Sequence, residues 1–286
     1  MRFNSIKQAV ALAACMLPSA FSQASGGTNG TADVTPNTEF NAMRTMSVGF
    51  VVVPGWEILD VFGPLEILFS LSYFNKMTLS IISPEVGLVP AGVPPHSFAA
   101  GLPKTDYGYV LTPQIQSTHT FANAPALDIL FVAGGFGVVA LDQENSTIIE
   151  DFIINRFPRV EYIVGISLGV VPLAKAGILN GKRATTNKSA WSYVTTGRGS
   201  NVSWVPSARW VQDGKVWTSS GVSAGLDTTY ALLKFLYGPE PLDTMMNVIE
   251  YAPHINPSWD PYAVVYNVTG ANTTETLQDC VAPVGL

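Results

Sequence analysis

The stretch Glu161–Gly169, EYIVGISLG, decides the fold of this chain. Its apolar first half predicts a strand buried on both faces of a parallel sheet. A helical pattern follows from Leu168 to Ala176 and ends at Gly177, the residue type that commonly terminates helices. The pentapeptide GISLG therefore places a G-x-S-x-G pattern at a strand-to-helix turn, where that pattern lifts a serine above the sheet edge. We predict that Ser167 is the functional centre; the simpler interpretation is that Gly and Ser only allow a close turn.

The segments on either side of this stretch repeat the alternation of strand and helix. Each predicted strand is a short apolar run, and each predicted helix has apolar residues at helical spacing. The predicted strands are Ser47–Val53, Met77–Ser83 and Asp128–Ala133, and the predicted helices are Ile58–Phe74, Ser146–Phe157 with Asn145 as a candidate cap, and Ala224–Tyr237. The pair Asp213-Gly214 predicts a hairpin between Val205–Val211 and Lys215–Thr218, and Pro84–Ala126 indicates a hairpin and loops. This order predicts an α/β fold: a doubly wound parallel sheet flanked by helices.

One domain accounts for most of the chain. With 286 residues, 47% of them hydrophobic, the chain can bury one sizeable core. We assign residues 46–239 to that domain, and residues 240–286, which contain Pro and Trp, to an irregular C-terminal extension. Residues 25–45, rich in Gly, Thr, Asn and Pro, indicate a disordered leader.

The first 24 residues have the layout of a signal peptide. Arg2 and Lys7 precede an apolar run, Ala9–Phe21, and small residues follow it. The run is too short to span a bilayer, and the alternative interpretation is a buried first helix. We expect a protein that enters the secretory pathway and has no membrane span.

Composition supports export and excludes several classes of function. Six Asn-X-Ser/Thr triplets favour a secreted glycoprotein; they begin at Asn29, Asn145, Asn187, Asn201, Asn267 and Asn272. Cys15 lies in the signal segment, so only Cys280 remains, which excludes an internal disulfide and a thiolate metal site. The net charge of −6 without a basic cluster argues against nucleic acid as a partner. We expect neither a metal nor another cofactor.

Two further groups are expected at the same sheet edge as Ser167. Gly134-Gly135 closes a neighbouring predicted strand. The backbone N–H groups of these glycines, together with that of Leu168 directly after Ser167, can donate hydrogen bonds to a developing anion. The alternative is that the two glycines only make the turn after the strand. Asp60 follows the first strand in the apolar run ILDVF, where burial would raise its pKa and suit it to proton transfer. The alternative is an Asp that caps its helix. Glu66 is a second acidic candidate.

Four stretches carry a family resemblance: GWEILDVFGPLEIL, DILFVAGGFG, YIVGISLGVVPLAKAGILNGKRATT and WTSSGVSAGLDTTYALLKFL. Together they resemble the ThiJ/PfpI superfamily, within the class I glutamine-amidotransferase-like, flavodoxin-like fold, and especially its isonitrile-hydratase-like branch. The resemblance covers most of residues 47–238. It implies that an acidic residue after the first strand, here Asp60, faces the elbow residue, here Ser167. In these relatives the elbow residue is a nucleophilic Cys.

The chain departs from that branch at three positions: Ser167 replaces the Cys, Leu168 stands where relatives tend to have Thr, and Asn187 corresponds to a frequent His. A thiol is partly ionised near neutral pH and is intrinsically nucleophilic, whereas a serine hydroxyl needs an adjacent base. We therefore expect Asp60 to transfer protons and Ser167 to position the substrate or water.

Three functions follow as hypotheses. The first is an isonitrile-hydratase-like hydro-lyase acting on a small, fairly apolar molecule, as in secondary-metabolite biosynthesis. Four side chains could line its pocket, although they are equally well explained as core: Trp56, Phe62, Phe136 and Leu168.

The second hypothesis is a serine hydrolase whose triad combines Ser167 with Asp227 or Asp243 and with His254. The third is a non-catalytic binding scaffold that has lost the family Cys. A homodimer is expected only by analogy with relatives.

Overall fold

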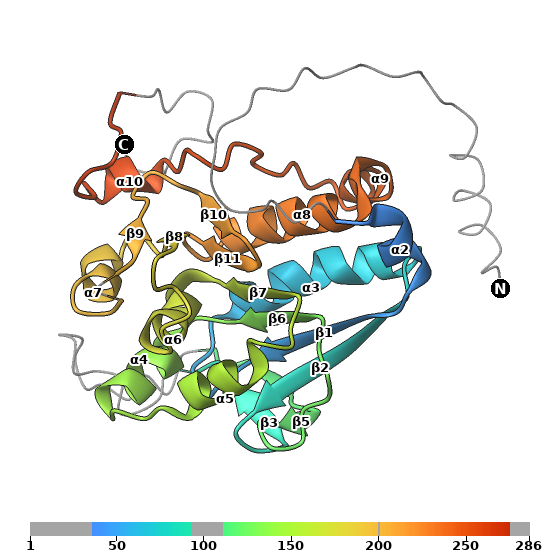
Figure 1. Cartoon of the computed structure of the whole chain (residues 1–286), viewed down its shortest axis with the longest axis horizontal. Coiled ribbons are helices and arrows are strands. Elements are labelled where there is room, and N and C mark those ends of the chain that lie inside the picture. Colours follow the sequence, from blue (N-terminus) through green and yellow to red (C-terminus); the bar gives the residue numbers. More distant parts are fainter. Residues whose placement is uncertain (1–35, 93–110, 200, 275–286) are drawn as a thin grey trace. The chain divides into compact units, whose positions relative to one another are not determined.

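A seven-stranded sheet in the order β10-β11-β7-β6-β1-β2-β5 forms the centre of the computed structural model (Figure 1). The structure describes residues 36–92, 111–199 and 201–274. The strands are β1 (Met46–Val51), β2 (Met77–Ser83), β5 (His119–Thr120), β6 (Ile129–Val132), β7 (Tyr162–Gly165), β10 (Trp210–Asp213) and β11 (Val216–Ser219). Neighbouring strands are parallel except β10 and β11, which form the antiparallel hairpin predicted at Asp213-Gly214.

The strand order fixes where a site can form. The chain runs from β1 outward to β2 and later returns to β6 on the other side of β1, before it continues to β7 and β11. This is the doubly wound arrangement predicted from the sequence, with its switch point between β1 and β6. The carboxyl ends of β1, β6 and β7 therefore share one edge of the sheet, and the segments that follow them carry Asp60, Gly134 and Ser167.

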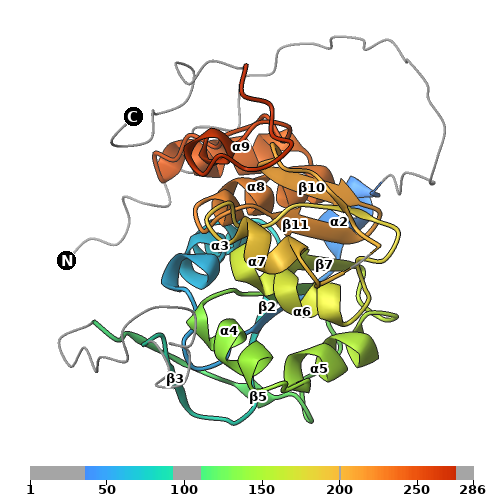
Figure 2. The same cartoon turned by 90° about the vertical axis from the view of Figure 1, so that its left-hand side faces the viewer.

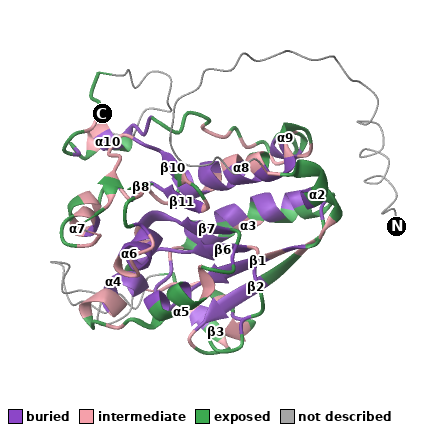
Figure 3. Ribbon diagram, viewed as in Figure 1, coloured by how far each residue is buried: buried purple, intermediate pink, exposed green. Residues whose placement is uncertain are grey.

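Helices cover both faces of this sheet (Figures 1 and 2). One layer contains α3 (Ile58–Ser72) and α8 (Ala224–Tyr237), and the other contains α4 (Phe136–Gln143), α5 (Ile148–Arg156) and α6 (Val170–Lys175). Successive residues of a strand point to opposite faces, so Phe131 packs in the α3/α8 core and Val132 in the α5/α6 core. Both faces of the central strands are thus apolar, and Figure 3 shows them buried.

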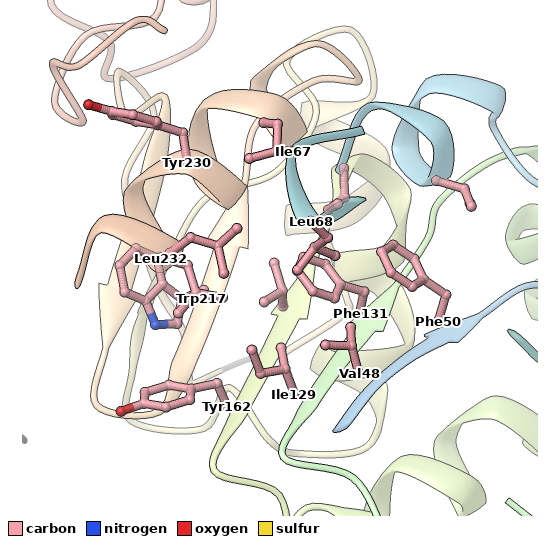
Figure 4. Packing of buried hydrophobic residues seen from close by; sticks show 14 of the residues in the cluster. Val48, Phe50, Ile67, Leu68, Ile129, Phe131, Tyr162, Trp217, Tyr230 and Leu232 are labelled. Atoms are coloured by element: carbon pink, nitrogen blue, oxygen red, sulfur yellow. The ribbon is translucent and has the colours of Figure 1, made fainter. Parts of the chain in front are cut away.

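The α3/α8 core is built around stacked aromatic rings. Phe50 and Phe131, neighbours on β1 and β6, lie with ring centroids 4.6 Å apart and nearly parallel planes (Figure 4). Ile67 and Leu68 of α3 pack on the same cluster. Burial of each such side chain contributes about 1.5–3 kcal/mol, and this packing fixes the position of α3 over β1.

Three details inside the domain differ from the sequence prediction. Helix α4 is absent from the sequence prediction, in which Gly134-Gly135 closes a strand and offers backbone donors. Asn145 does not cap α5: it adopts a positive φ of 54°, and Thr147 occupies the N-cap position. The helix predicted from Leu168 begins instead with a tight 3₁₀ turn, η3 (Ser167–Gly169).

Both ends of the domain hold more structure than predicted. The segment assigned to a disordered leader contains α2 (Thr38–Met43), which begins where the Asn37 side chain accepts the Phe40 N–H and which packs on α8. The extension assigned as irregular contains α9 (Pro239–Val248) and α10 (Tyr262–Val265). Pro239 occupies the first turn of α9, where a missing N–H costs nothing, so Gly238-Pro239 both ends one helix and begins the next.

Short elements complete the described part of the chain. β3 (Leu88–Pro90) and β4 (Gln114–Gln116) form the hairpin expected within residues 84–126, while β8 (Arg183–Ala184), β9 (Ser203–Trp204) and α7 (Trp191–Thr195) follow α6. Within the described residues, no helix combines the length and apolarity needed to cross a bilayer. The predicted signal peptide, Asn29 and Cys280 lie outside the described residues.

Candidate functional site

Ser167 lies in a strained turn between β7 and α6. Its φ of 54° belongs to the left-handed region, which costs an L-residue roughly 1–2 kcal/mol. The turn also requires Gly169, because a Cβ there would stand 2.0 Å from the Val132 carbonyl oxygen. The Gly169 N–H closes the turn by donating to the Ile166 carbonyl oxygen at 2.7 Å. The GISLG pentapeptide thus forms the sharp elbow that its sequence predicts.

Asp60 lies in the first turn of α3 and is fully buried. Its Oδ2 accepts a hydrogen bond of 2.8 Å from the Gly134 N–H, across the sheet edge, while its Oδ1 has no hydrogen-bond partner among the described residues. Glu57 occupies the N-cap position of the helix, so Asp60 is not its cap. Glu66, the second acidic candidate, is exposed and takes no part in this arrangement.

Burial raises the pKa of Asp60 well above its ordinary value of 3.8. The hydrogen bond from Gly134 stabilises the charged form and lowers the pKa, and the nearby Glu57 carboxylate raises it further. Because burial is the largest of these effects, the folded protein keeps Asp60 protonated at pH values where an exposed carboxyl group is ionised. Since Oδ2 already accepts the Gly134 N–H, Oδ1 is the oxygen left to carry that proton.

Gly134 lies between the carboxyl group and the elbow. A Cβ on Gly134 would stand 2.8 Å from Asp60 Oδ2, 2.6 Å from the Leu168 nitrogen and 2.9 Å from the Gly169 nitrogen. The structure therefore brings the Asp60 carboxyl group and the start of η3 to the same point. Only a glycine fits between them.

The oxyanion role predicted for Gly134 does not match its contacts, whereas that of Gly135 stays a prediction. The Gly134 N–H already donates to Asp60, so it orients the carboxyl group. Gly135 has a φ of 122°, and a Cβ there would stand 2.3 Å from the Gly55 carbonyl oxygen, so this glycine lets the start of α4 pack against the loop before α3. The N–H groups of Gly135 and of Leu168, in the first turn after the elbow, remain the predicted donors.

Asn187 is a site residue that sequence reasoning did not select. Its Nδ2 donates to Ser167 Oγ at 3.0 Å, and its Oδ1 accepts from the Ser189 N–H at 2.9 Å, which fixes the orientation of the amide. The neighbouring Thr186 hydroxyl donates to the Ser167 carbonyl oxygen at 3.1 Å. One signal in the sequence points to Asn187 as a site residue: it stands at the position of a frequent His in the isonitrile-hydratase-like branch that the chain resembles.

The serine-hydrolase triad is not assembled. Asp227 accepts the backbone N–H of His254 at 2.9 Å, not a ring N–H, and Asp243 accepts the Tyr230 hydroxyl at 2.6 Å. The hydroxyl group of Ser167 is instead bonded to the Asn187 amide. An amide cannot remove a proton, so Asn187 does not serve the serine as a base.

The four predicted pocket residues divide into core and surface. Trp56 is core, since it is 1% exposed and its indole N–H donates to the Val89 carbonyl oxygen. Phe62 and Phe136 are 41% and 40% exposed, and Leu168 is half-buried. Among the described residues, no group of three or more His, Cys, Asp or Glu is placed to hold a metal ion.

The sequence profile of the DJ-1/PfpI family matches residues 46–234, which include β1, the elbow and most of α8. The chain belongs to the DJ-1/PfpI family. Within this family it is similar to the isonitrile hydratase of Pseudomonas putida, with 31% identity over 213 residues, or 73% of this chain and 79% of that protein.

Solved structures of the DJ-1/PfpI family agree with this fold. A THiJ/PfpI family protein from Pseudomonas syringae is 25% identical and superposes with a TM-score of 0.60 over 79% of this chain and 83% of its own. Drosophila melanogaster DJ-1beta is 19% identical, with a TM-score of 0.57 over 73% of this chain and 100% of its own, a likeness of fold alone.

Proposed function

We propose that this member of the DJ-1/PfpI family adds water to an isonitrile, R–N≡C, and releases the N-substituted formamide R–NH–CHO. The observation that carries the proposal is the buried Asp60 carboxyl group: its Oδ1 has no partner among the described residues, and its Oδ2 converges on Gly134 with the backbone nitrogens of Leu168 and Gly169. The 31% identity with an isonitrile hydratase supports the choice of reaction. The exposed rings of Phe62 and Phe136, close in sequence to Asp60 and Gly134, suit a small apolar substrate.

Asp60 supplies and recovers the single proton that the reaction needs. The terminal carbon of an isonitrile carries a lone pair, and transfer of the Oδ1 proton to it gives the nitrilium ion R–N≡C–H⁺ and the Asp60 carboxylate. The oxygen of a water molecule then forms a bond to that carbon, and the carboxylate accepts a proton from the water. The product, R–N=CH–OH, becomes the formamide when a proton moves from oxygen to nitrogen. Asp60 ends protonated, as it began.

Ser167 positions the reactants in this scheme. Its Oγ accepts the Asn187 N–H, so its own O–H proton is left to donate toward the water or the substrate. The raised pKa of Asp60 keeps the acid in its protonated form, which the first step requires. The rate should therefore fall as the pH rises through that pKa.

The decisive experiment compares purified wild type, Asp60→Asn and Ser167→Ala with an isonitrile substrate, with formamide followed by NMR. Asp60→Asn keeps an acceptor for the Gly134 N–H but cannot donate an acidic proton, so its kcat should fall about 10²- to 10⁴-fold. Ser167→Ala should lose less. Asp151→Asn, which removes an exposed carboxylate on α5, serves as the matched control.

Each alternative gives a different result. Full activity of Asp60→Asn contradicts the proposed role of the carboxyl group. A fluorophosphonate probe that labels wild type but not Ser167→Ala would favour the hydrolase. Binding without turnover in both wild type and Asp60→Asn would favour the scaffold.

We also propose that the protein is exported and glycosylated. The proposal rests on the signal-like residues 1–24 and on exposed sequons at Asn145, Asn201, Asn267 and Asn272. Asn187 is half-buried and its amide nitrogen bonds Ser167, so it should stay unmodified. Amino-terminal sequencing of the expressed protein and mass spectrometry of its glycopeptides test both points; a retained Met1 or a sugar on Asn187 would contradict them.

A further inference from the structure

A cavity of about 330 Å³ adjoins the candidate site. Two of its lining residues connect it to the proposed chemistry: Leu59 directly precedes Asp60, and Asn187 donates to Ser167 Oγ at 3.0 Å. Its volume is at the lower end of the range of small-molecule pockets. It has room for a compact organic group but not for a dinucleotide or a peptide.

One wall of the cavity comes from the C-terminal segment, beyond the residues 46–234 matched by the family profile. Tyr262 of α10 and the following Tyr266 line it and are 39% and 52% exposed. The chain just before α10 contacts the start of β10, where the Arg209 N–H donates to the Pro257 carbonyl oxygen at 2.8 Å (Figure 1). The segment is held there by Asp260, which accepts the Ser220 hydroxyl and lies 3.5 Å from Arg209 Nη1.

The cations in the cavity wall already have partners. Arg209 Nη2 lies 2.8 Å from Asp227 Oδ2, in addition to its contact with the carboxylate before α10. Lys188 Nζ donates to the Thr185 hydroxyl at 2.7 Å and to the Ala208 carbonyl oxygen at 2.8 Å. Burial lowers the pKa of Lys188 to about 7. A carboxylate on the ligand would have to compete with these internal contacts, whereas a neutral group would not.

We infer that this cavity binds the R group of the isonitrile and that Tyr262 and Tyr266 select a neutral R group with one aromatic ring. Aromatic rings prefer edge-to-face or offset contact with one another, and two tyrosines offer such contacts to a ring between them. The inference rests on the proposed isonitrile hydration, and it names the substrate class of the same site.

The test compares benzyl isonitrile with methyl isonitrile and with 4-carboxybenzyl isonitrile. For the double variant Tyr262→Ala/Tyr266→Ala, the ratio of KM for benzyl to KM for methyl isonitrile should rise about tenfold relative to wild type. Wild type should bind the charged analogue more weakly than the benzyl compound. Tyr73→Ala, which removes a 72% exposed tyrosine at the far end of α3 from Asp60, is the matched control and should leave the ratio unchanged.

Calorimetric binding of N-benzylformamide, the expected product, separates failure of this inference from failure of the proposed reaction. Product binding that weakens about tenfold in the double variant supports the cavity assignment, whether or not wild type hydrates isonitriles. If wild type hydrates no isonitrile, that failure overturns the proposed reaction and leaves the cavity assignment standing. An unchanged KM ratio together with unchanged product binding overturns the assignment. Tighter binding of the 4-carboxybenzyl compound than of the benzyl compound overturns the preference for a neutral ring.

Discussion

Replacing Asp60 with Asn should raise the stability of the protein relative to wild type by an amount that grows as the pH rises. In the unfolded chain the Asp60 carboxyl group ionises near 3.8, its ordinary value, whereas burial in the folded protein raises its pKa well above that value. At pH values between these two pKa values, the Asp60 carboxyl group takes up one proton when the chain folds. The asparagine variant needs no proton, and its side-chain oxygen can still accept the Gly134 N–H.

The size of the effect follows from proton linkage. One proton taken up on folding lowers the free energy of unfolding by about 1.4 kcal/mol for each pH unit. The stabilising contribution of protonated Asp60 is fully present below pH 3.8 and is lost as the pH rises through the folded pKa. The stability difference between Asp60→Asn and wild type should therefore grow by about 1.4 kcal/mol per pH unit in that window and stay constant above it.

Urea unfolding of wild type and Asp60→Asn at a series of pH values from about 5 upward measures this difference. Asp151→Asn reports the general effect of removing one negative charge from an exposed position on α5. A difference between Asp60→Asn and wild type that does not change with pH would refute the reasoning. Asp60 would then ionise normally in the folded protein and hold no proton for the proposed reaction.

Three other substitutions test the surroundings of the site. Gly134→Ala should destabilise the protein by about 1–3 kcal/mol in urea unfolding and abolish activity, because the added Cβ would overlap backbone and carboxyl atoms. Its control is Gly181→Ala, at a position with positive φ but open space around it. That variant should lose only about 1 kcal/mol of stability and keep its activity. Arg209→Met should cost about 3–5 kcal/mol, because it removes the cation that pairs with two buried carboxylates, and a thermal shift below 1 °C would contradict that ion-pair role. Asn187→Leu should cost about 1 kcal/mol and lower kcat, whereas unchanged kcat would mean that the bond to Ser167 does not position the hydroxyl.

The fold could be predicted because its decisive signals are local. The run Ile129–Val132 is apolar at every position, as a strand covered on both faces must be, and the GISLG turn follows a strand of the same kind. Parallel strands bring their carboxyl ends to one edge, so the convergence of Asp60 with the elbow also followed from the order of elements.

The missed features depend on contacts that no local pattern encodes. Asn187 bonds Ser167 across 20 residues, and α2 is held by the contact of Asn41 with the Leu236 carbonyl oxygen, 195 residues away. The short helix α10 follows Asp260, whose partner Arg209 lies in a different part of the chain. Helices this short gain little from intrinsic propensity, so tertiary packing decides whether they form.

The identities of Ser167 and Asn187 are chemically consistent with each other. A nucleophilic serine needs a base that removes its proton, whereas the Asn187 amide donates a hydrogen bond to Oγ and cannot accept that proton. This contact favours a neutral hydroxyl group that orients a reactant. Proton transfer is then left to the group at the other side of Gly134, the buried Asp60 carboxyl. Ser167 and Asn187 stand where the isonitrile-hydratase-like branch that the sequence resembles has Cys and frequently His. Their contact is consistent with the proposed reaction, in which the first step protonates the substrate and no covalent intermediate forms.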